Sequence, residues 1–283
     1  DNEMQTDVLI IGSGLAGATA ALRLAEDRQR HITVITRAAE PIESNSQYAQ
    51  GGIVGRGGDD TAELLVEDVL NAGDGISYRP AVEILAQEGP KIIKRLLMDQ
   101  TGVEFDRDAQ GQIIYGLEAA HSRRRILHVG DLTGKAIMKA MLKTISEQPN
   151  IRLLTNQTAV DLLTFPHHAL APQAIYEPLH CHGAYVFAHD TCQVNPILAG
   201  TTILATGGLG QIFMNTSNPP GSRGDGLAMA YRAGARVVNA EYIQFHPTAL
   251  HMPGATKHLI SEAVRGEGGI LITPDGDAFM ERY

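Results

Sequence analysis

The chain has 283 residues, 43% of them hydrophobic, so it is long enough to bury the core of one large domain or two small ones. Its 23 basic and 32 acidic residues give a net charge of −9, which argues against nucleic acid as a main partner, because phosphate binding needs a basic surface. The two cysteines suit a reducing compartment. Because no apolar run reaches the length of a membrane span and the N-terminus lacks the parts of a signal peptide, we expect a cytoplasmic protein.

The first elements expected are a buried strand at 7–11, a helix at 15–27 and a second strand at Ile32–Ile35. The turn between the first strand and the helix has the pattern G-x-G-x-x-G, which is typical of a dinucleotide pyrophosphate site at a helix N-terminus. Gly12 allows the tight turn, Gly14 lets backbone N–H groups approach a phosphate, and Gly17 lets the helix pack close to the strand. The predicted cofactor contacts of this turn are Gly12, Ser13, Gly14, Leu15, Ala16 and Gly17.

The end of the second strand leaves the kind of dinucleotide open. An acidic residue usually binds the adenosine ribose there, and this sequence has Thr36 and Arg37 instead, which disfavours NAD. Taken alone, Arg37 fits the 2′-phosphate of NADP or an ordinary exposed arginine at a strand end.

The middle of the chain alternates a long loop, helices and short strands. The segment 41–60 is rich in Gly, Ser, Asn and Asp and is expected to be a functional loop. Apolar residues at intervals of three and four then predict helices, and short β-rich runs predict strands. The expected helices are 62–71, 81–99 and 132–146, the strands are 151–154, 159–164, 184–188 and 200–204, and 166–178 is a loop.

The strand at 200–204 ends in glycines and is expected to return to the first sheet. A helix at 227–233, for which Asp225 fits the N-cap, and a strand at 235–238 should follow. A new unit is expected from Asn239 onward, and the last residues, 275–283, show no closing strand or helix.

A patch rich in histidine and cysteine raises the question of a metal. Its spacing matches no zinc pattern, so we predict no metal site there. The patch consists of His167, His168, His180, Cys181, His182, His189 and Cys192.

Four separated motifs together resemble the flavoprotein family of succinate dehydrogenase and fumarate reductase. They are the glycine turn at 12–17, the segment 45–52 (NSQYAQGG), the run 205–210 (ATGGLG) and Gly224-Asp-Gly. Within that family, the segment 118–128 (EAAHSRRRILH) is similar to the branch that oxidises L-aspartate. The resemblance implies an α/β fold: a Rossmann-like FAD-binding domain of the GR2 flavoprotein type at 1–238, followed at 239–283 by the beginning of an α+β capping domain that continues in relatives.

The resemblance implies FAD as cofactor and accounts for Arg37, because this branch tolerates a non-acidic residue there. Asn45 stands where respiratory relatives carry a histidine bound covalently to FAD, so the FAD here should be non-covalent. Gly51 and Gly52 would let the backbone run flat against the flavin, beside polar side chains. The implied contacts, besides the glycine turn, are Arg37, Asn45, Ser46, Gln47, Tyr48, Ala49, Gln50, Gly51, Gly52, Ala205, Thr206, Gly207 and Asp225.

The resemblance also implies a substrate site. A carboxylate at Glu118 suits a substrate ammonium, which succinate lacks; its alternative is an exposed loop glutamate. His246 and Thr248 match residues that bind a substrate carboxylate, and Arg265 matches the catalytic arginine. His121 and the run Arg123, Arg124 and Arg125 fit a solvated basic face or a rim that attracts dicarboxylates, with no catalytic role assigned.

The implied function is FAD-dependent oxidation of L-aspartate to iminoaspartate, with oxygen or fumarate as electron acceptor. The product would enter NAD biosynthesis through quinolinate, with quinolinate synthase as a partner. Two alternatives stay open at this point: a soluble fumarate reductase-type flavoprotein, and a non-catalytic FAD-binding fragment. The second arises because relatives continue beyond the point matching Tyr283, and under this alternative the 283 residues alone would be inactive.

Overall fold

A computed structural model describes residues 4–118, 120–246, 248–250, 252 and 259–282. The chain forms two compact units, and each is assembled from two separate segments. The first unit comprises Asp1–Tyr48 and Ile137–Phe245, and the second comprises Ala49–Ala136 and His246–Tyr283. The expected division into 1–238 and 239–283 remains a prediction. None of the described helices is long and apolar enough to cross a bilayer.

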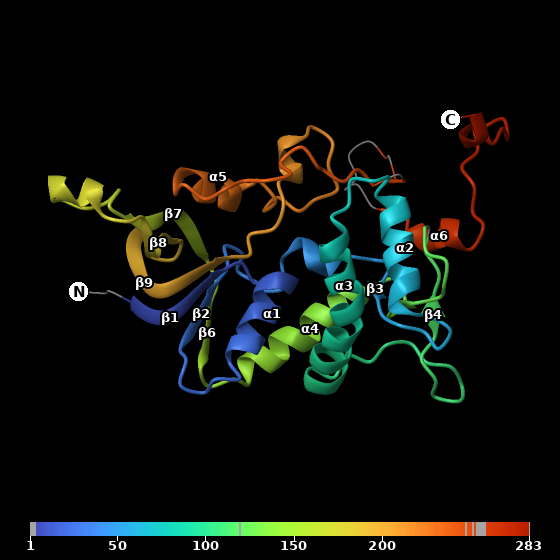
Figure 1. The fold of residues 1–283 in the computed structure, drawn as a ribbon, viewed down its shortest axis with the longest axis horizontal. Coiled ribbons are helices and arrows are strands. Elements are labelled where there is room, and N and C mark those ends of the chain that lie inside the picture. Colours follow the sequence, from blue (N-terminus) through green and yellow to red (C-terminus); the bar gives the residue numbers. More distant parts are fainter. Residues whose placement is uncertain (1–3, 119, 247, 251, 253–258, 283) are drawn as a thin grey trace. The chain divides into compact units, whose positions relative to one another are not determined.

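The first unit is built on a six-stranded sheet in the order β6-β2-β1-β9-β8-β7 (Figure 1). The first four of these strands are parallel, and β8 and β7 are antiparallel to their neighbours. Leu204 at the end of β9 pairs with Ile11 at the end of β1, which confirms the expected return to the first sheet and the α/β fold class. The strands are β1 (Met4–Ile11), β2 (Ile32–Ile35), β6 (Ile151–Leu154), β7 (Gln157–Phe165), β8 (His180–Ala188) and β9 (Gln193–Leu204).

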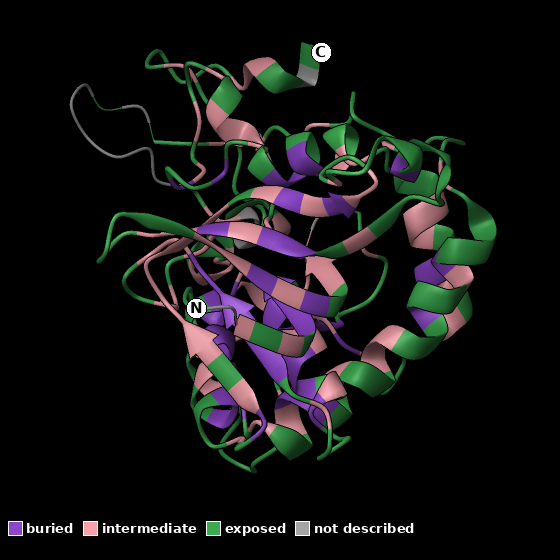
Figure 2. Ribbon diagram, turned by 90° about the vertical axis from the view of Figure 1, so that its left-hand side faces the viewer, coloured by how far each residue is buried: buried purple, intermediate pink, exposed green. Residues whose placement is uncertain are grey.

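Strand β1 lies at the centre of the core because both of its faces are covered. Leu9 and Ile11 contribute to a cluster that includes Met229 of α5 (Asp225–Arg232), and the alternation of a strand turns Val8 and Ile10 to the opposite face. Figure 2 shows the buried residues, in purple, concentrated along these strands.

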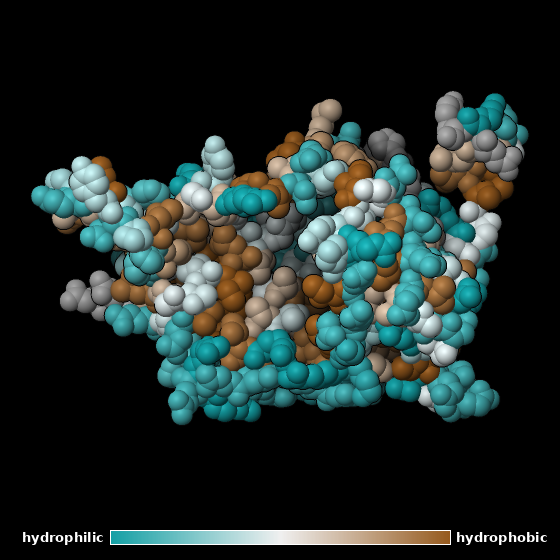
Figure 3. Space-filling model, viewed as in Figure 1, coloured by the Kyte–Doolittle hydropathy of each residue, from teal (hydrophilic) through white to brown (hydrophobic). Residues whose placement is uncertain are grey.

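Two longer helices, α1 (Leu15–Leu24) and α4 (Thr133–Ser146), lie on one side of the sheet in Figure 1. At intervals of one, three and four residues, α4 presents Ile137, Met138, Met141 and Ile145 to the core, each at most 4% exposed. In Figure 3 the surface below α1 and α4 is hydrophilic, as expected for the turns that connect these helices to the next strands. Short 3₁₀ helices are η1 (Asn45–Tyr48), η3 (Pro172–Tyr176) and η4 (Gly210–Ile212).

The second unit combines two packed helices with a small antiparallel sheet. Helix α2 (Ala62–Ala72) begins where the side chain of Thr61 accepts a hydrogen bond from the backbone N–H of Leu64 at 3.3 Å. Helix α3 (Arg79–Ile92) contains Pro90, which supplies no N–H, and continues as a π-helix, η2 (Ile93–Gln100). The remaining elements are β3 (Ile53–Val54), β4 (Tyr115–Gly116) and β5 (Ile126–Leu127), in the sheet order β3-β5-β4, with α6 (Glu262–Gly266) and η5 (Phe279–Arg282).

Several local predictions were wrong. The expected loop at 41–60 contains both η1 and β3, and η5 lies in the segment expected to be irregular. The described residues 235–238 form no strand: Gly234 ends the turn after α5 with φ of 80°, and Val238 remains 59% exposed instead of pairing in a sheet. The expected N-cap, Asp225, is instead the first residue of α5. The N-cap of this helix is Gly224, which adopts φ of 79°.

Candidate functional site

The turn after β1 is packed so closely that two of its glycines have no room for a side chain. Gly12 has φ of 115°, and a Cβ there would lie 2.2 Å from the carbonyl oxygen of Ala205. A Cβ on Gly17 would lie 1.9 Å from the carbonyl oxygen of Gly12. The ends of β1 and β9 and the first turn of α1 therefore meet by backbone contact, which is the close packing expected from the sequence pattern.

The N-terminus of α1 is arranged to favour a negative group. Its N-cap is Gly14, which has no side chain to cap the helix, and its first turn contains no acidic residue. The hydroxyl of Ser46 accepts a hydrogen bond from the backbone N–H of Leu15 at 3.1 Å and so ties the 41–48 segment to the helix end. The first N–H groups of a helix carry partial positive charge, so this end can bind a phosphate.

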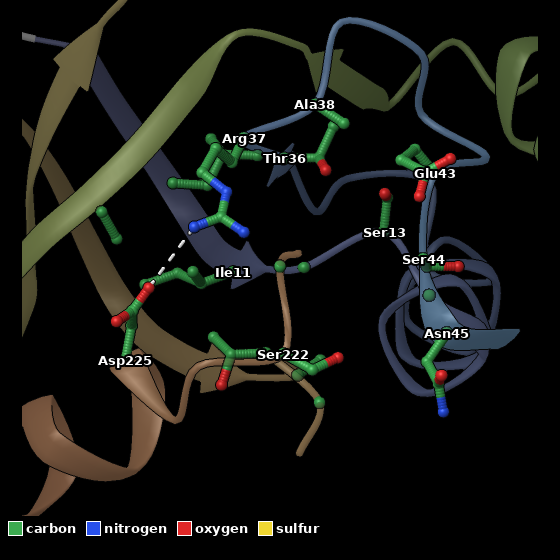
Figure 4. A pocket seen from close by; sticks show the side chains of 18 of the residues that line it. Ile11, Ser13, Thr36, Arg37, Ala38, Glu43, Ser44, Asn45, Ser222 and Asp225 are labelled. Carbon is green, nitrogen blue, oxygen red and sulfur yellow. Dashed lines mark ion pairs between the residues drawn. The ribbon is translucent and has the colours of Figure 1, made fainter. Parts of the chain in front are cut away.

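A pocket of about 700 Å³ lies at this helix end, and every residue that lines it belongs to the first unit (Figure 4). This volume is within the range of about 300–1,000 Å³ that is usual for cofactor and ligand sites. Twelve of the predicted cofactor residues line it: Gly12, Ser13, Gly14, Leu15, Ala16, Arg37, Asn45, Ser46, Ala205, Thr206, Gly207 and Asp225.

Arg37 and Asp225 form an ion pair in this pocket (Figure 4). The distance from Nη1 of Arg37 to Oδ2 of Asp225 is 3.5 Å, and Arg223 lies 3.2 Å from the same oxygen. The Arg37 guanidinium also lies against the backbone at Gly221, where a Cβ would be 2.7 Å from Nη2. The pocket thus presents both a cation and an anion to a ligand.

Two predicted residues next to the pocket make other contacts. The side-chain amide of Gln47 donates a hydrogen bond to the Glu43 carboxylate at 2.6 Å, and the hydroxyl of Tyr48 donates to the same group at 2.8 Å. The hydrogen bond to Glu43 raises the pKa of the Tyr48 phenol. Gln47 and Tyr48 therefore hold Glu43, which itself lines the pocket.

Sequence reasoning missed a second wall of the pocket. Thr36 lies at the end of β2, and its carbonyl accepts a hydrogen bond from the N–H of Gln157, the first residue of β7. Ligands of open parallel sheets bind at the carboxyl ends of the strands, so the segment after β6 could have been anticipated from that rule. The missed lining residues include Thr36, Ala38, Glu43, Ser44, Gln157, Thr158, Ala159, Pro219, Pro220, Gly221 and Ser222.

The second unit contains the other part of the predicted flavin segment and Glu118. A Cβ on Gly51 would lie 2.4 Å from Oε1 of Glu118, so the carboxylate lies against the backbone of Gly51. The carbonyl of Gly51 accepts a hydrogen bond from the hydroxyl of Thr133 at 2.8 Å. The predicted cofactor residues in this unit are Ala49, Gln50, Gly51 and Gly52.

The remaining predicted substrate residues also lie in the second unit. Arg265 is exposed on α6, and the next residue, Gly266, is so close to the Glu118 loop that a Cβ would lie 2.5 Å from the carbonyl oxygen of Leu117. Nδ1 of His246 lies 2.7 Å from the carbonyl oxygen of Thr248 and 3.2 Å from its backbone nitrogen. The residue between them, Pro247, lies outside the described residues.

The arginine run is not a uniform basic face. Arg123 and Arg124 are exposed, but Arg125 has no exposed surface and binds the carboxylates of Asp60 and Asp68. The interpretation of Arg125 as part of a solvated face or rim is therefore wrong.

In the described part of the chain, no group of three or more His, Cys, Asp or Glu side chains could hold a metal ion.

Comparison with known proteins shows what the chain is similar to. Residues 7–283 match the family model for the FAD binding domain. L-aspartate oxidase 1 of Ralstonia nicotianae is 43% identical, and L-aspartate oxidase of Pseudomonas aeruginosa is 42% identical; each alignment covers 99% of this chain and 51% of the relative. The chain thus spans about half the length of the curated relatives it matches.

Two solved structures share the fold. A quinol-fumarate reductase with bound menaquinol has a TM-score of 0.87 and 25% identity, over all of this chain and 46% of its own. Sdh1 of Mycobacterium smegmatis, in complex with UQ1, has a TM-score of 0.82 and 28% identity, over 99% of this chain and 47% of its own. With the parallel sheet, the glycine turn and a family match over nearly its whole length, the chain belongs to the FAD binding domain family.

Proposed function

We propose that the first unit holds FAD non-covalently and that the protein oxidises L-aspartate to iminoaspartate. The pocket fits a dinucleotide: its glycine turn leaves no space for side chains, and the N-terminus of α1 lacks an acid that would repel a pyrophosphate. Asn45 lines the pocket with an amide, which cannot form the covalent bond that a histidine forms in respiratory relatives.

The observation that carries the substrate proposal is the placement of Glu118. Its carboxylate lies against Gly51, inside the proposed flavin segment, and its loop touches α6 beside Arg265. An anion at this position suits a substrate that carries an ammonium group and disfavours a plain dicarboxylate. The relatives of about 40% identity named L-aspartate oxidase support the same substrate.

The chain's own residues bind and orient the substrate in this proposal. Glu118 pairs with the ammonium, and His246, Thr248 and Arg265 bind the two carboxylates, with Arg265 nearest the hydrogen that leaves Cα. A guanidinium offers several N–H donors in a planar fork that matches a carboxylate, so Arg265 is suited to anchor one. Bound FAD would supply the two-electron acceptor for the hydride from Cα, with oxygen or fumarate as the final electron acceptor. The product would feed NAD biosynthesis through quinolinate synthase.

Anaerobic addition of L-aspartate to the FAD-loaded protein tests this function, and we expect the flavin absorption to bleach. Glu118→Gln should slow this bleaching more than it slows reoxidation of the reduced flavin by fumarate, because fumarate has no ammonium. Equal losses of both rates would remove the role given to Glu118.

A soluble fumarate reductase is the second candidate, favoured by the similarity to the quinol-fumarate reductase structure. It predicts that fumarate oxidises the reduced flavin while L-aspartate leaves the oxidised flavin unchanged. A protein that binds FAD but reacts with neither compound would instead have a non-catalytic FAD-binding role.

A further inference from the structure

The loop that carries Glu118 is a hairpin loop whose far end is fixed by a buried charge. It runs from Leu117 to Arg125, between β4 and β5, which pair with Tyr115 opposite Leu127 and Gly116 opposite Ile126. Glu118 is the second residue after β4, and Arg125 is the last residue before β5. The two ends of the loop therefore leave the sheet next to each other.

Arg125 is bound rigidly to α2 and the residues just before it. Its Nε and Nη2 donate hydrogen bonds to the two carboxylate oxygens of Asp60 at 2.9 and 2.7 Å, and its Nη1 donates to Oδ2 of Asp68 at 2.5 Å. The Arg125 side chain has no exposed surface and that of Asp68 has 12%. A guanidinium in a bidentate contact with a carboxylate has little freedom to rotate, so this cluster is a fixed point in the unit.

A chain of two hydrogen bonds joins this fixed point to Glu118. Nη1 of Arg125 lies 3.0 Å from Nδ1 of His121. A guanidinium has only donors, so Nδ1 accepts and the ring is neutral, with its proton on Nε2. Burial and then the charge of Arg125 lower the pKa of His121, in agreement with a neutral ring. The backbone N–H of His121 in turn donates to the carbonyl oxygen of Glu118 at 3.2 Å.

The near end of the loop has little space in which to move. Leu117 lies against Gly266, and the Glu118 carboxylate lies against Gly51. Ser122 donates two further hydrogen bonds to Asp68, from its backbone N–H at 2.9 Å and from its hydroxyl at 3.0 Å. His121 is joined to Glu118 by the backbone hydrogen bond, so a shift of His121 would change the place of the Glu118 carboxylate against Gly51.

We propose that Arg125 and His121 are positioning residues that set the place of the Glu118 carboxylate and thereby the preference for an amine-bearing substrate. This inference rests on the proposed function, in which Glu118 binds the ammonium. A purely structural role for the cluster would affect every reaction of the flavin alike. A positioning role affects only the reaction that uses the ammonium.

The FAD-loaded protein with His121→Ala is the main test, because this substitution removes the hydrogen bond between His121 and Arg125 and leaves the contacts of Arg125 with both aspartates in place. We expect bleaching by L-aspartate to slow by roughly 10- to 100-fold, the scale of a misplacement of about 1 Å. Reoxidation by fumarate should change by less than about threefold, because fumarate has no ammonium for Glu118 to bind. A threefold change in rate corresponds to a change of about 0.7 kcal/mol in the activation free energy. His121→Asn should restore most of the lost rate, because its amide oxygen can accept from Arg125.

A double variant shows whether His121 acts through Glu118. In a Glu118→Gln background, His121→Ala should have no further effect on the reaction with L-aspartate. Arg79→Ala, at the exposed start of α3 in the same unit, serves as the control and should leave both rates unchanged. Arg125→Lys keeps the charge but loses the planar fork, and should give the same selective loss as His121→Ala.

The outcomes separate this inference from the proposed function. If L-aspartate does not bleach the flavin of the unaltered protein, the proposed function is overturned and the inference with it. If the unaltered protein and Glu118→Gln behave as expected, but His121→Ala slows both reactions equally or adds to the loss in Glu118→Gln, only the positioning role is overturned.

Discussion

At the scale of single residues, some glycines pack against backbone and others face open space. Gly12 and Gly17 belong to the first kind, whereas a Cβ on Gly208 would meet nothing within 4 Å. Because all three lie in the first unit, they allow a test of the cofactor turn with an internal control.

Gly17→Ala should abolish tight binding of FAD, since its Cβ would push α1 away from the carbonyl of Gly12 and open the turn. Titration with FAD, followed by quenching of flavin fluorescence, measures the affinity. Gly208→Ala is the matched control and should retain the unaltered protein's secondary structure by circular dichroism. Unchanged FAD affinity in Gly17→Ala would contradict the importance of this close packing.

His121 should make folding stability depend on pH. Burial first, and the charge of Arg125 second, lower its pKa below 6.5, while the charges of Asp68 and Asp60 act in the opposite direction. The unfolded chain then binds a proton more readily than the folded one, so the free energy of unfolding decreases as the pH falls below about 6.5 and is insensitive to His121 above it.

Urea unfolding at about pH 8 and about pH 5.5 measures this effect. We expect His121→Asn, which keeps the hydrogen bond but does not titrate, to lose less stability between the two pH values than the unaltered protein. An identical loss in both proteins would show that other groups are responsible.

At the scale of elements, the β4–β5 hairpin depends on one buried ion cluster and one exposed ion pair. Arg125 has no exposed surface, whereas the exposed Arg124 lies 3.4 Å from Glu267. Two adjacent arginines of one loop therefore have very different environments.

Arg125→Leu should lower the free energy of unfolding by about 3–5 kcal/mol, because it leaves the buried carboxylate of Asp60 and the partly buried carboxylate of Asp68 without their partner. Arg124→Ala should cost at most about 1 kcal/mol, the value of an exposed pair. Urea denaturation followed by circular dichroism compares the two variants. Similar costs for both would mean that the Arg125 cluster is no more important than a surface contact.

The elements also show where sequence reasoning succeeds. The apolar periodicities of α2 and α4 and the buried run of β1 gave the right elements within a few residues, because burial on one or both faces dictates those patterns. The valines at 237 and 238 suggested a strand. A strand also needs a neighbouring strand with which to pair, and the local sequence does not show whether one is available.

In the candidate site, the glycine turn was predictable because glycine is required where neighbouring backbone leaves no room for a side chain. The wall formed by Thr36 and Gln157 was missed because it depends on which strand ends meet in space. The burial of Arg125 was also missed: three consecutive arginines look alike in sequence, and the acids that bind the third lie more than fifty residues earlier.

At the scale of the whole molecule, the proposed cofactor pocket and Glu118 lie in different units of the chain. Binding of the dinucleotide and selection of the amine should therefore be separable by mutation. We expect Glu118→Gln to bind FAD within about threefold of the unaltered protein, a difference below about 0.7 kcal/mol. Equilibrium dialysis with FAD measures this, and a loss of affinity similar to that of Gly17→Ala would contradict the separation.

The pairing of β1 with β9 has a consequence for synthesis on the ribosome. Met4 pairs with Ile197, so the strand that pairs with one edge of β1 is synthesised nearly two hundred residues later. At about 5–20 residues per second, this delay lasts roughly 10–40 s. During that time β2 is the native neighbour available to β1. The other edge of β1 has unpaired N–H and C=O groups and is open to other nascent strands. Chaperones that shield exposed strand edges should therefore raise the yield of this protein most when they act before β9 leaves the ribosome.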